Sequence, residues 1–294
     1  MRERARERAA PVDGHRARKR FGQHFLVDTG VVRAIVDAIA PRGGQHIVEI
    51  GPGLGALTEV LLERVEAIQA VELDRDLARR LRGRYPAARL ALHEADALAF
   101  DFGLALPEEA RATGQRLRIV GNLPYNISSP LLIRLLEQRA SVDDLHFMLQ
   151  KEVVDRIVAG PGSADYGRLA VLMQSFSHCV RLFDVPASAF DPPPRVESAV
   201  VRMALRRERD AVDPAPLQAV LAVAFGQRRK MLRGTLLPWL AQRGVEAPEI
   251  DPTARAEQIG IDVWWALANR VAARAAGGPA GPAGSPAGGP AGPA

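Results

Sequence analysis

The segment of this sequence best suited to a chemical task consists of Asn122, Leu123, Pro124 and Tyr125. The Asn122 side-chain oxygen and the Leu123 carbonyl are two acceptors that can hold both hydrogens of an aromatic amine such as that of adenine. Pro124 stiffens the turn and restricts Leu123 to an extended conformation. Tyr125 can stack on a base, which is worth about 1–3 kcal/mol. A plain surface turn, which Asn and Pro readily make, is the competing interpretation.

A glycine-rich segment earlier in the chain has the features of a cofactor loop. Gly51, Gly53 and Gly55 follow a short apolar segment and precede a helical one. Glycine permits positive φ and lets a ligand approach the backbone. The spacing differs from the dinucleotide fingerprint, whose third glycine comes one residue later. Methyltransferase loops commonly use this shorter form, since they need not seat a pyrophosphate on the helix N-terminus. A tight turn without a ligand is the alternative.

Two acidic residues follow strands at positions suited to the same cofactor. Glu72 ends the strand after the glycine loop, where a carboxylate can accept hydrogen bonds from ribose hydroxyls. Asp96 falls just after the third strand and can accept from an adenine amine, although an aspartate there is equally suited to cap a helix. The glycine loop together with these acids favours ligand binding.

Such a set of residues is suited to the transfer of a group that is already activated. An adenine amine is a poor nucleophile because its lone pair is delocalised, and two acceptors favour a pyramidal nitrogen. A sulfonium methyl donor requires no metal or general base, so the protein supplies alignment and polarisation. The 6 histidines are scattered, and Cys179 is the only cysteine. We therefore expect no metal site and no disulfide.

The segments that position these residues predict an α/β fold. Apolar strands are expected at residues 46–50, 67–71, 89–92, 117–120, 145–149 and 198–203. Helical patterns at residues 31–40, 57–65 and 77–81 separate the first of them. Strands that alternate with helices indicate a mostly parallel sheet covered on both faces.

Changes in composition divide the chain into four parts. Residues 1–20 form a basic arm that either touches RNA or is merely solvated, and residues 276–294 form a flexible Gly/Pro/Ala tail. Between them we expect an α/β domain at residues 21–205 and a small helical domain at residues 206–275. The expected helices of the latter lie at residues 214–224, 225–240 and 253–273.

The net charge of +5 suits a polyanionic partner without proving one. Within a predicted amphipathic helix over residues 225–233, four basic side chains are expected to contact phosphates: Arg228, Arg229, Lys230 and Arg233. A solvated basic face is the alternative. The sequence has no secretory signal and no stretch near the roughly 20 apolar residues of a membrane helix. We therefore expect a cytoplasmic location and no membrane partner.

Seven segments together resemble the ribosomal RNA small-subunit adenine dimethyltransferases, the bacterial enzymes whose loss gives kasugamycin resistance. They are residues 19–28, 48–55, 71–74, 119–130, 166–169, 189–202 and 225–230. They span nearly all of the chain between its two ends and are highly specific in combination. The resemblance implies a Rossmann-like class I methyltransferase sheet, a small C-terminal helical domain that contacts RNA, and S-adenosylmethionine as methyl donor.

The resemblance also implies a reaction, the N6,N6-dimethylation of two adjacent adenines near the 3′ end of 16S ribosomal RNA, in the small subunit or its precursor. It places the cofactor against six residues, which are His24, Leu26, Gly51, Glu72, Asp96 and Asn122. The glycine loop adds Gly53 as a further cofactor contact. Position 24 is often asparagine in such enzymes, so His24 is either a cofactor contact or a structural histidine. Phe190 would complete an aromatic sandwich with Tyr125, unless it is a core residue.

Two other functions are compatible with these motifs. A large-subunit adenine dimethyltransferase, of the kind that confers macrolide resistance, shares the Gly-x-Gly and Asn-x-Pro-aromatic motifs. Such relatives typically lack the combination of runs found here at residues 122–130 and 192–202. The other candidate is a ribosome-assembly factor that acts mainly by binding. The sequence has no obvious dimerisation device, so we expect a monomer.

Overall fold

The computed structural model describes residues 23–209 and 212–276, and the chain divides into two compact units between Pro214 and Ala215. The expected basic arm, and the expected tail from residue 277 on, lie outside the described residues. The division falls later in the chain than the boundary expected at residue 206. The Arg206 N–H donates to the Phe176 carbonyl at 2.9 Å, which keeps this segment on the first unit.

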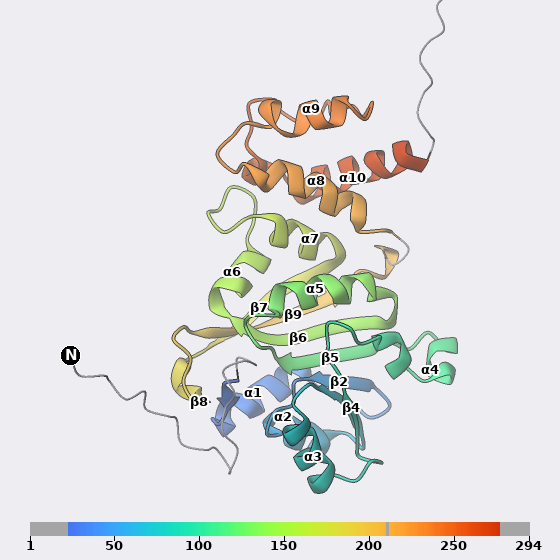
Figure 1. Ribbon diagram of the computed structural model, residues 1–294, viewed down its shortest axis with the longest axis vertical. Coiled ribbons are helices and arrows are strands. Elements are labelled where there is room, and N and C mark those ends of the chain that lie inside the picture. Colours follow the sequence, from blue (N-terminus) through green and yellow to red (C-terminus); the bar gives the residue numbers. More distant parts are fainter. Residues whose placement is uncertain (1–22, 210–211, 277–294) are drawn as a thin grey trace, which may run out of the picture. The chain divides into compact units, whose positions relative to one another are not determined.

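A mostly parallel sheet of seven strands lies at the centre of the first unit in the described part of the chain (Figure 1). Its strands are β2 (His46–Ile50), β3 (Ile68–Glu72), β4 (Leu90–Glu94), β5 (Leu117–Asn122), β6 (Val142–Gln150), β7 (Ser177–Val185) and β9 (Ser198–Leu205). The order is β4-β3-β2-β5-β6-β9-β7, and β9 runs antiparallel to both of its neighbours. The predicted parallel α/β sheet is confirmed, and each of the six predicted strands overlaps an observed one.

The order of the strands brings the glycine loop next to the Asn122 segment. From β2 the chain proceeds outwards to β3 and β4, then crosses back to β5 on the other side of β2. Ligands of open parallel sheets bind at the carboxyl ends of the strands where the order reverses in this way. The glycine loop follows β2 and Asn122 ends β5, so both lie at that point.

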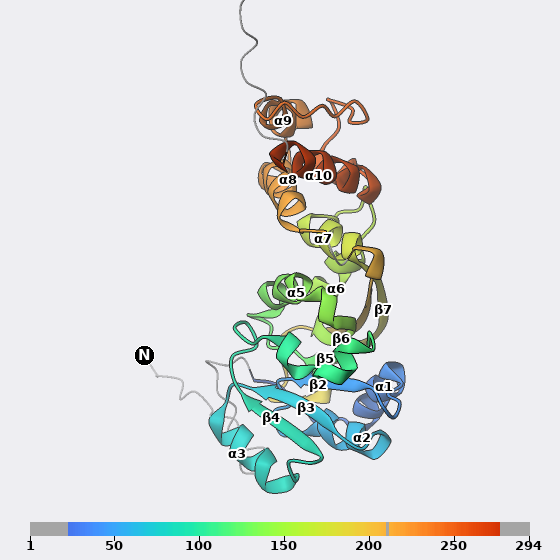
Figure 2. The same cartoon turned by 90° about the vertical axis from the view of Figure 1, so that its right-hand side faces the viewer.

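Helices connect the strands and pack around the sheet. In chain order they are α1 (Thr29–Ile39), α2 (Ala56–Arg64), α3 (Arg75–Arg84), α4 (Glu108–Ala112), α5 (Ser128–Glu137), α6 (Lys151–Val158) and α7 (Arg168–Phe176). The Asp28 carboxylate caps α1 by accepting from the Gly30 and Val31 N–H groups at 2.8 and 3.0 Å. Helices α1 and α2 pack against each other (Figure 2).

A short antiparallel ladder connects the start of the described chain to a segment far along the sequence. Strands β1 (Phe25–Leu26) and β8 (Phe190–Asp191) pair, with Leu26 opposite Phe190. The N–H groups of Val27 and Asp28 continue the connection by donating to the Ala189 carbonyl at 2.9 and 3.2 Å. The residues just before α1 are thereby fixed beside the sheet.

The second unit is helical, as predicted, and consists of α8 (Ala215–Gly226), α9 (Leu236–Ala241) and α10 (Ile261–Ala276). Helices α9 and α10 both contact α8. The buried Trp264 ring lies 5.8 Å from the Phe225 ring, centroid to centroid. None of the helices among the described residues has the length and apolar character of a membrane span.

The predicted continuous helix over residues 225–233 is wrong. Helix α8 ends at Gly226, a turn follows, and Leu232 begins a short 3₁₀ turn. The N–H groups of Leu232 and Arg233 donate to the carbonyls of Ala254 and Pro252 at 2.8 and 3.0 Å. These bonds to a distant segment replace the bonds that a continuing helix would make, and they accompany the full burial of Leu232.

Candidate active site

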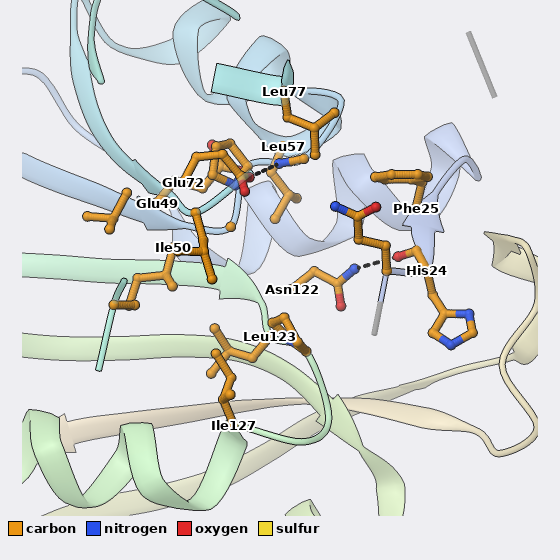
Figure 3. A pocket seen from close by; sticks show the side chains of 18 of the residues that line it. His24, Phe25, Glu49, Ile50, Leu57, Glu72, Leu77, Asn122, Leu123 and Ile127 are labelled. Carbon is orange, nitrogen blue, oxygen red and sulfur yellow. Dashed lines mark hydrogen bonds between the residues drawn. The ribbon is translucent and has the colours of Figure 1, made fainter. Parts of the chain in front are cut away.

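A cavity opens at the carboxyl ends of β2, β3 and β5 (Figure 3). Among its lining residues are ten of those predicted from the sequence: His24, Leu26, Gly51, Gly53, Glu72, Asp96, Asn122, Leu123, Pro124 and Tyr125. The structure therefore brings the predicted cofactor loop and the predicted amine-binding segment together. Phe190 does not line this cavity, and the four basic residues belong to the second unit.

The glycine loop has a backbone conformation that residues with a Cβ rarely adopt. Gly51 and Gly53 have φ angles of 65° and 60°, in the left-handed region that favours glycine. A Cβ on Gly53 would lie 3.4 Å from the Phe25 ring. The Gly51 N–H donates to the Val71 carbonyl at 2.9 Å, which fixes the loop against β3. The loop thus forms a cradle in which a ligand can approach the backbone.

Glu72 is a buried acceptor at one side of this cradle. Its Oε1 accepts from the Asp74 N–H at 2.7 Å and its Oε2 from the Gly53 N–H at 3.2 Å. Burial raises the pKa of this carboxyl, while the backbone hydrogen bonds oppose the rise. Each carboxylate oxygen has a second lone pair. Glu72 is therefore suited to accept from two neighbouring hydroxyl groups.

Asp96 caps a turn and still has acceptor capacity toward the cavity. Its Oδ1 accepts from the Leu98 N–H at 2.9 Å, in a turn that does not continue as a helix. Its other oxygen accepts no hydrogen bond from the part of the chain that the structure describes. The two predicted roles are thus compatible, and the contact with an adenine amine stays a prediction.

The Asn122 segment is held firmly on both sides. The Leu123 N–H donates to the Met148 carbonyl at 3.1 Å, and the Pro124 carbonyl accepts from the Ser128 hydroxyl at 3.1 Å. The Asn122 Nδ2 donates to the His24 carbonyl at 3.2 Å. Within residues 23–209 and 212–276, the Asn122 Oδ1 accepts no hydrogen bond. An amide oxygen is thus available beside the cradle.

The Tyr125 ring is fixed through its hydroxyl and lies beside an imidazole. The hydroxyl is 2.8 Å from the Ser198 Oγ, and Ser198 is fully buried. The rings of His24 and Tyr125 are stacked, with centroids 5.8 Å apart and planes inclined by 23°. Figure 3 shows the His24 ring turned away from Glu72. Phe190 is 3% exposed and packs in the hydrophobic core. Its stacking on a target base stays a prediction.

The sequence motifs include Glu49, whose role in the cavity wall became apparent only in the structure. Its side chain is 1% exposed, and the Thr58 hydroxyl donates to Oε2 at 2.5 Å. Burial raises the pKa of Glu49 to about 7, although the Thr58 hydrogen bond lowers it and the charge of Glu72 adds to the rise. The signal in the sequence is a carboxylate that interrupts the apolar run Ile47, Val48 and Ile50 just before the glycine loop.

The four predicted RNA-contacting residues are exposed, but they follow α8 instead of lying on one helix. Arg228, Arg229 and Lys230 lie in the turn after Gly226, and Arg233 lies in the 3₁₀ turn. Arg228 forms an ion pair with Glu257 at 3.3 Å. Their contact with phosphates stays a prediction.

Comparison with known proteins connects this chain to ribosomal RNA methylation. The profile of the ribosomal RNA adenine dimethylase family matches residues 14–273. The ribosomal RNA small subunit methyltransferase A of Bordetella petrii is 58% identical over 251 residues, which cover 84% of this chain and 92% of that protein. The protein of the same name from Thiobacillus denitrificans is 53% identical over 262 residues, 88% of this chain and 100% of that protein.

Two solved structures have the same fold. The dimethyladenosine transferase of Plasmodium falciparum superposes with a TM-score of 0.70 at 21% identity and covers 86% of this chain and 98% of that chain. The 23S rRNA methyltransferase ErmE superposes with a TM-score of 0.60 at 23% identity, covering 84% of this chain and 99% of that one. These likenesses confirm the predicted Rossmann-like methyltransferase fold.

Proposed function

This chain belongs to the ribosomal RNA adenine dimethylase family, and we propose that it transfers methyl groups from S-adenosylmethionine to two adjacent adenines near the 3′ end of 16S ribosomal RNA. The products are N6,N6-dimethyladenines, formed during maturation of the small subunit. The observation that carries the proposal is the available Asn122 amide oxygen beside a glycine cradle in one cavity.

The cavity has the features that S-adenosylmethionine needs. Gly51 and Gly53 leave room at the backbone, and the buried Glu72 offers its carboxylate to the two ribose hydroxyls. The free oxygen of Asp96 would accept from the adenine amine of the cofactor, and Leu26 contributes apolar wall. When bound, S-adenosylmethionine supplies a sulfonium-activated methyl group.

The Asn122 segment would hold the target amine. Its Oδ1 and the Leu123 carbonyl accept the two amine hydrogens, which favours a pyramidal nitrogen with its lone pair directed toward the methyl group. The rigid turn at Pro124 keeps the two acceptors at a fixed separation. The Tyr125 ring, fixed through Ser198, offers its face to the base. Alignment of the reacting atoms is the main source of rate in such a site.

The degree of similarity favours the small subunit as substrate over the large one. The relatives from Bordetella petrii and Thiobacillus denitrificans, 58% and 53% identical, are named for the small subunit, whereas the 23S rRNA methyltransferase ErmE is 23% identical. We further propose that the chain acts as a monomer in the cytoplasm, on the small subunit or its precursor. In this proposal Arg228, Arg229, Lys230 and Arg233 contact RNA phosphates, and Phe190 joins Tyr125 around the target base.

Methylation of purified subunits tests the proposal. The full chain is incubated with S-adenosylmethionine and with small or large subunits from cells that lack this activity, and the RNA is digested for mass analysis. We expect four methyl groups on two adjacent adenines of 16S RNA and none on 23S RNA. Methylation of 23S RNA alone, or of neither RNA, would contradict the proposal.

A Glu72→Ala variant separates catalysis from binding. It should lose S-adenosylmethionine binding, because the ribose acceptor is gone, and still bind small subunits. In cells that lack the protein, this variant should fail to restore dimethylated 16S RNA. If it nevertheless restored normal subunit maturation, the chain would act chiefly as an assembly factor.

A further inference from the structure

Dimethylation of one adenine consists of two methyl transfers, and the second acts on a different amine from the first. In each transfer the nitrogen lone pair forms a bond to the methyl carbon, the carbon–sulfur bond breaks with its electrons left on sulfur, and the nitrogen releases a proton to water. Before the first transfer the amine has two hydrogens for its two acceptors, Asn122 Oδ1 and the Leu123 carbonyl. After it the amine has one hydrogen, so one of these acceptors loses its donor.

The loss of one hydrogen bond changes how the target base is held. Two hydrogen bonds from one nitrogen fix the direction of the amine relative to the turn, whereas a single hydrogen bond allows the base to pivot about it. A ring stacked on the base restricts this pivot, and such stacking is worth about 1–3 kcal/mol for each base. The second transfer therefore depends more strongly on the Tyr125 ring than the first does, because alignment of the reacting atoms determines the rate.

The Tyr125 ring is held at its far end by a residue of the sheet. Its hydroxyl lies 2.8 Å from the Ser198 Oγ. Ser198 is fully buried, does not line the cavity, and begins β9 between Gln150 of β6 and Val185 of β7. The Lys151 N–H donates to the carbonyl of the residue before Ser198 at 3.0 Å. The partner of the tyrosine hydroxyl is therefore fixed on both sides of its strand.

We propose that Ser198 is a positioning residue, whose hydroxyl fixes the Tyr125 ring and thereby allows the second methyl transfer to follow the first. The proposal deepens the proposed function and rests on it. A residue outside the cavity would then determine the product, which is a dimethylated adenine instead of a monomethylated one.

Two variants remove this hydrogen bond from opposite ends. Ser198→Ala removes the partner and keeps the whole tyrosine, whereas Tyr125→Phe removes the hydroxyl and keeps a ring that can stack. The contact of this ring with the His24 ring, 5.8 Å between centroids, is retained in both variants. Ser175→Ala is the matched control, because Ser175 is also fully buried and its hydroxyl has no hydrogen-bond partner in the described part of the chain.

Single-turnover methylation of small subunits by the full chain, with the RNA digested for mass analysis at each time, separates the two transfers. In Ser198→Ala and Tyr125→Phe we expect both transfers to slow, and the ratio of the second rate to the first to fall by about tenfold, the equivalent of one hydrogen bond. N6-methyladenine should therefore accumulate. Ser175→Ala should form dimethyladenine as wild type does.

Two further measurements assign the effect to the one hydrogen bond. The double variant Ser198→Ala with Tyr125→Phe should resemble either single variant, because both changes remove the same bond. The dissociation constant of S-adenosylmethionine in Ser198→Ala should stay close to that of wild type, because Ser198 lies outside the cavity. Should Ser198→Ala lower the melting temperature, Tyr125→Phe leaves β9 unchanged and serves in the same comparison.

The ring signals of Tyr125 give a readout that needs no substrate. The chain has 3 tyrosines, and in a chain with ¹³C-labelled tyrosine the signals of Tyr125 are identified by their loss in Tyr125→Phe. We expect these signals to shift, with faster ring flips, in Ser198→Ala. They should be unchanged in Ser175→Ala.

Three results would overturn the proposal and leave the proposed function intact. Equal slowing of both transfers, without accumulation of N6-methyladenine, would show that the bond does not act on the second transfer. Unchanged Tyr125 signals in Ser198→Ala would show that this hydroxyl does not hold the ring. Accumulation of N6-methyladenine in Ser175→Ala to the same extent would assign the effect to a general loss of packing. If wild type itself formed no methylated adenine, the proposed function would fail, and this proposal with it.

Discussion

Glu49 has a carboxyl group whose charge changes near neutral pH. It is 1% exposed in the cavity wall, and burial raises its pKa from 4.5 to about 7. Between these two values the folded chain holds a proton that the unfolded chain releases. The contribution of Glu49 to stability is therefore most favourable below pH 4.5 and falls as the pH rises toward 7.

Glu49→Gln should remove this pH dependence, because the amide keeps an acceptor for the Thr58 hydroxyl and does not ionise. The difference in free energy of unfolding between wild type and variant should change by about 3 kcal/mol between pH 4.5 and 7.5, with wild type relatively weaker at the higher pH. Urea unfolding at a series of pH values measures this. Parallel pH profiles for the two proteins would show that Glu49 does not titrate in this range.

At the level of residues, the sequence was sufficient to predict cavity-lining residues that belong to short local motifs. The glycines at 51 and 53, Glu72 and the Asn122 segment stand in short motifs next to strands, and all of them line the cavity. Glu49 and Ser198 could not be identified from local spacing, because their tasks depend on contacts that only the fold creates. Glu49 accepts from Thr58, and Ser198 holds the Tyr125 hydroxyl. The same holds for the contact of His24 with Pro192, which joins residues 168 positions apart.

At the level of elements, Gly121 allows β5 to pass close to the end of β2. A Cβ at this position would collide with the main-chain carbonyl oxygen of Ile50. The Cβ would be fixed to the main chain of β5, and the oxygen belongs to the main chain of the paired strand β2, so neither atom can move without disturbing the sheet. Asn122 immediately follows Gly121, so its position depends on the close approach of β5 to the end of β2.

Gly121→Ala should therefore lower the free energy of unfolding by about 1–3 kcal/mol, the usual cost of overpacking, and should reduce methyl transfer by shifting Asn122. Gly43→Ala is the matched control, because a Cβ there has nothing within 4 Å. Urea unfolding of the two variants gives the comparison. Equal stability of both would mean that β5 and β2 can separate at no cost.

A buried arginine of β5, Arg118, connects this strand to β6 through an ion pair and to the end of α1 through a hydrogen bond. Arg118 donates to both oxygens of Asp144 at 2.9 Å and to the Ile39 carbonyl at 2.7 Å. Burial alone would raise the pKa of Asp144, but the contacts with His146 and Arg118 outweigh it, and the pKa is about 2. Asp144 is therefore charged throughout the neutral range and balances a buried guanidinium.

Asp144→Asn should destabilise the chain by about 3–5 kcal/mol at pH 7, because it leaves the buried charge of Arg118 without its partner. The neighbouring Asp143 provides the control, since its side chain is half-buried and pairs with the exposed Arg207 at 2.8 Å. Asp143→Asn should change stability by less than about 1 kcal/mol. Thermal unfolding that ranked the two variants equally would speak against a stabilising pair at Asp144.

Periodic and apolar elements could be predicted, while those determined by distant contacts could not. The predicted strands have runs of apolar residues, whereas β7, which was not predicted, is an edge strand that mixes His178, Arg181 and Asp184 with apolar residues. The helix predicted over residues 225–233 fails for a related reason. Its apolar spacing is helical, but backbone bonds to residues 252 and 254 determine the path of the chain.

At the level of the whole molecule, the α/β unit and the helical unit could both be predicted from the alternation of patterns along the chain. The position of the division could not, since the charged segment after residue 205 has no apolar pattern that assigns it to either unit. The second unit carries the basic residues expected to contact RNA. Arg229 and Lys230 are exposed, whereas Arg228 is paired with Glu257.

A variant with Arg229→Glu and Lys230→Glu should bind small subunits more weakly. The slope of log affinity against log salt should also become shallower by about 2, because each lost phosphate contact releases about one counterion fewer. Arg33→Glu with Arg42→Glu makes the same charge change at exposed positions of the first unit and should leave the slope nearly unchanged. An unaltered slope in the first variant would mean that its basic residues merely face solvent.

The proposed reaction depends on the Asn122 amide oxygen, which accepts a hydrogen of the target amine, while the glycine loop and Glu72 provide most of the binding of the methyl donor. Single-turnover methylation of small subunits by Asn122→Ala, together with titration of S-adenosylmethionine, measures the two contributions separately. We expect a rate lower by about 100-fold or more, the usual loss of a group that stabilises the reacting atoms, with the dissociation constant of the donor changed by less than about twofold. A normal rate, or a rate loss fully explained by weaker donor binding, would show that Asn122 does not hold the amine.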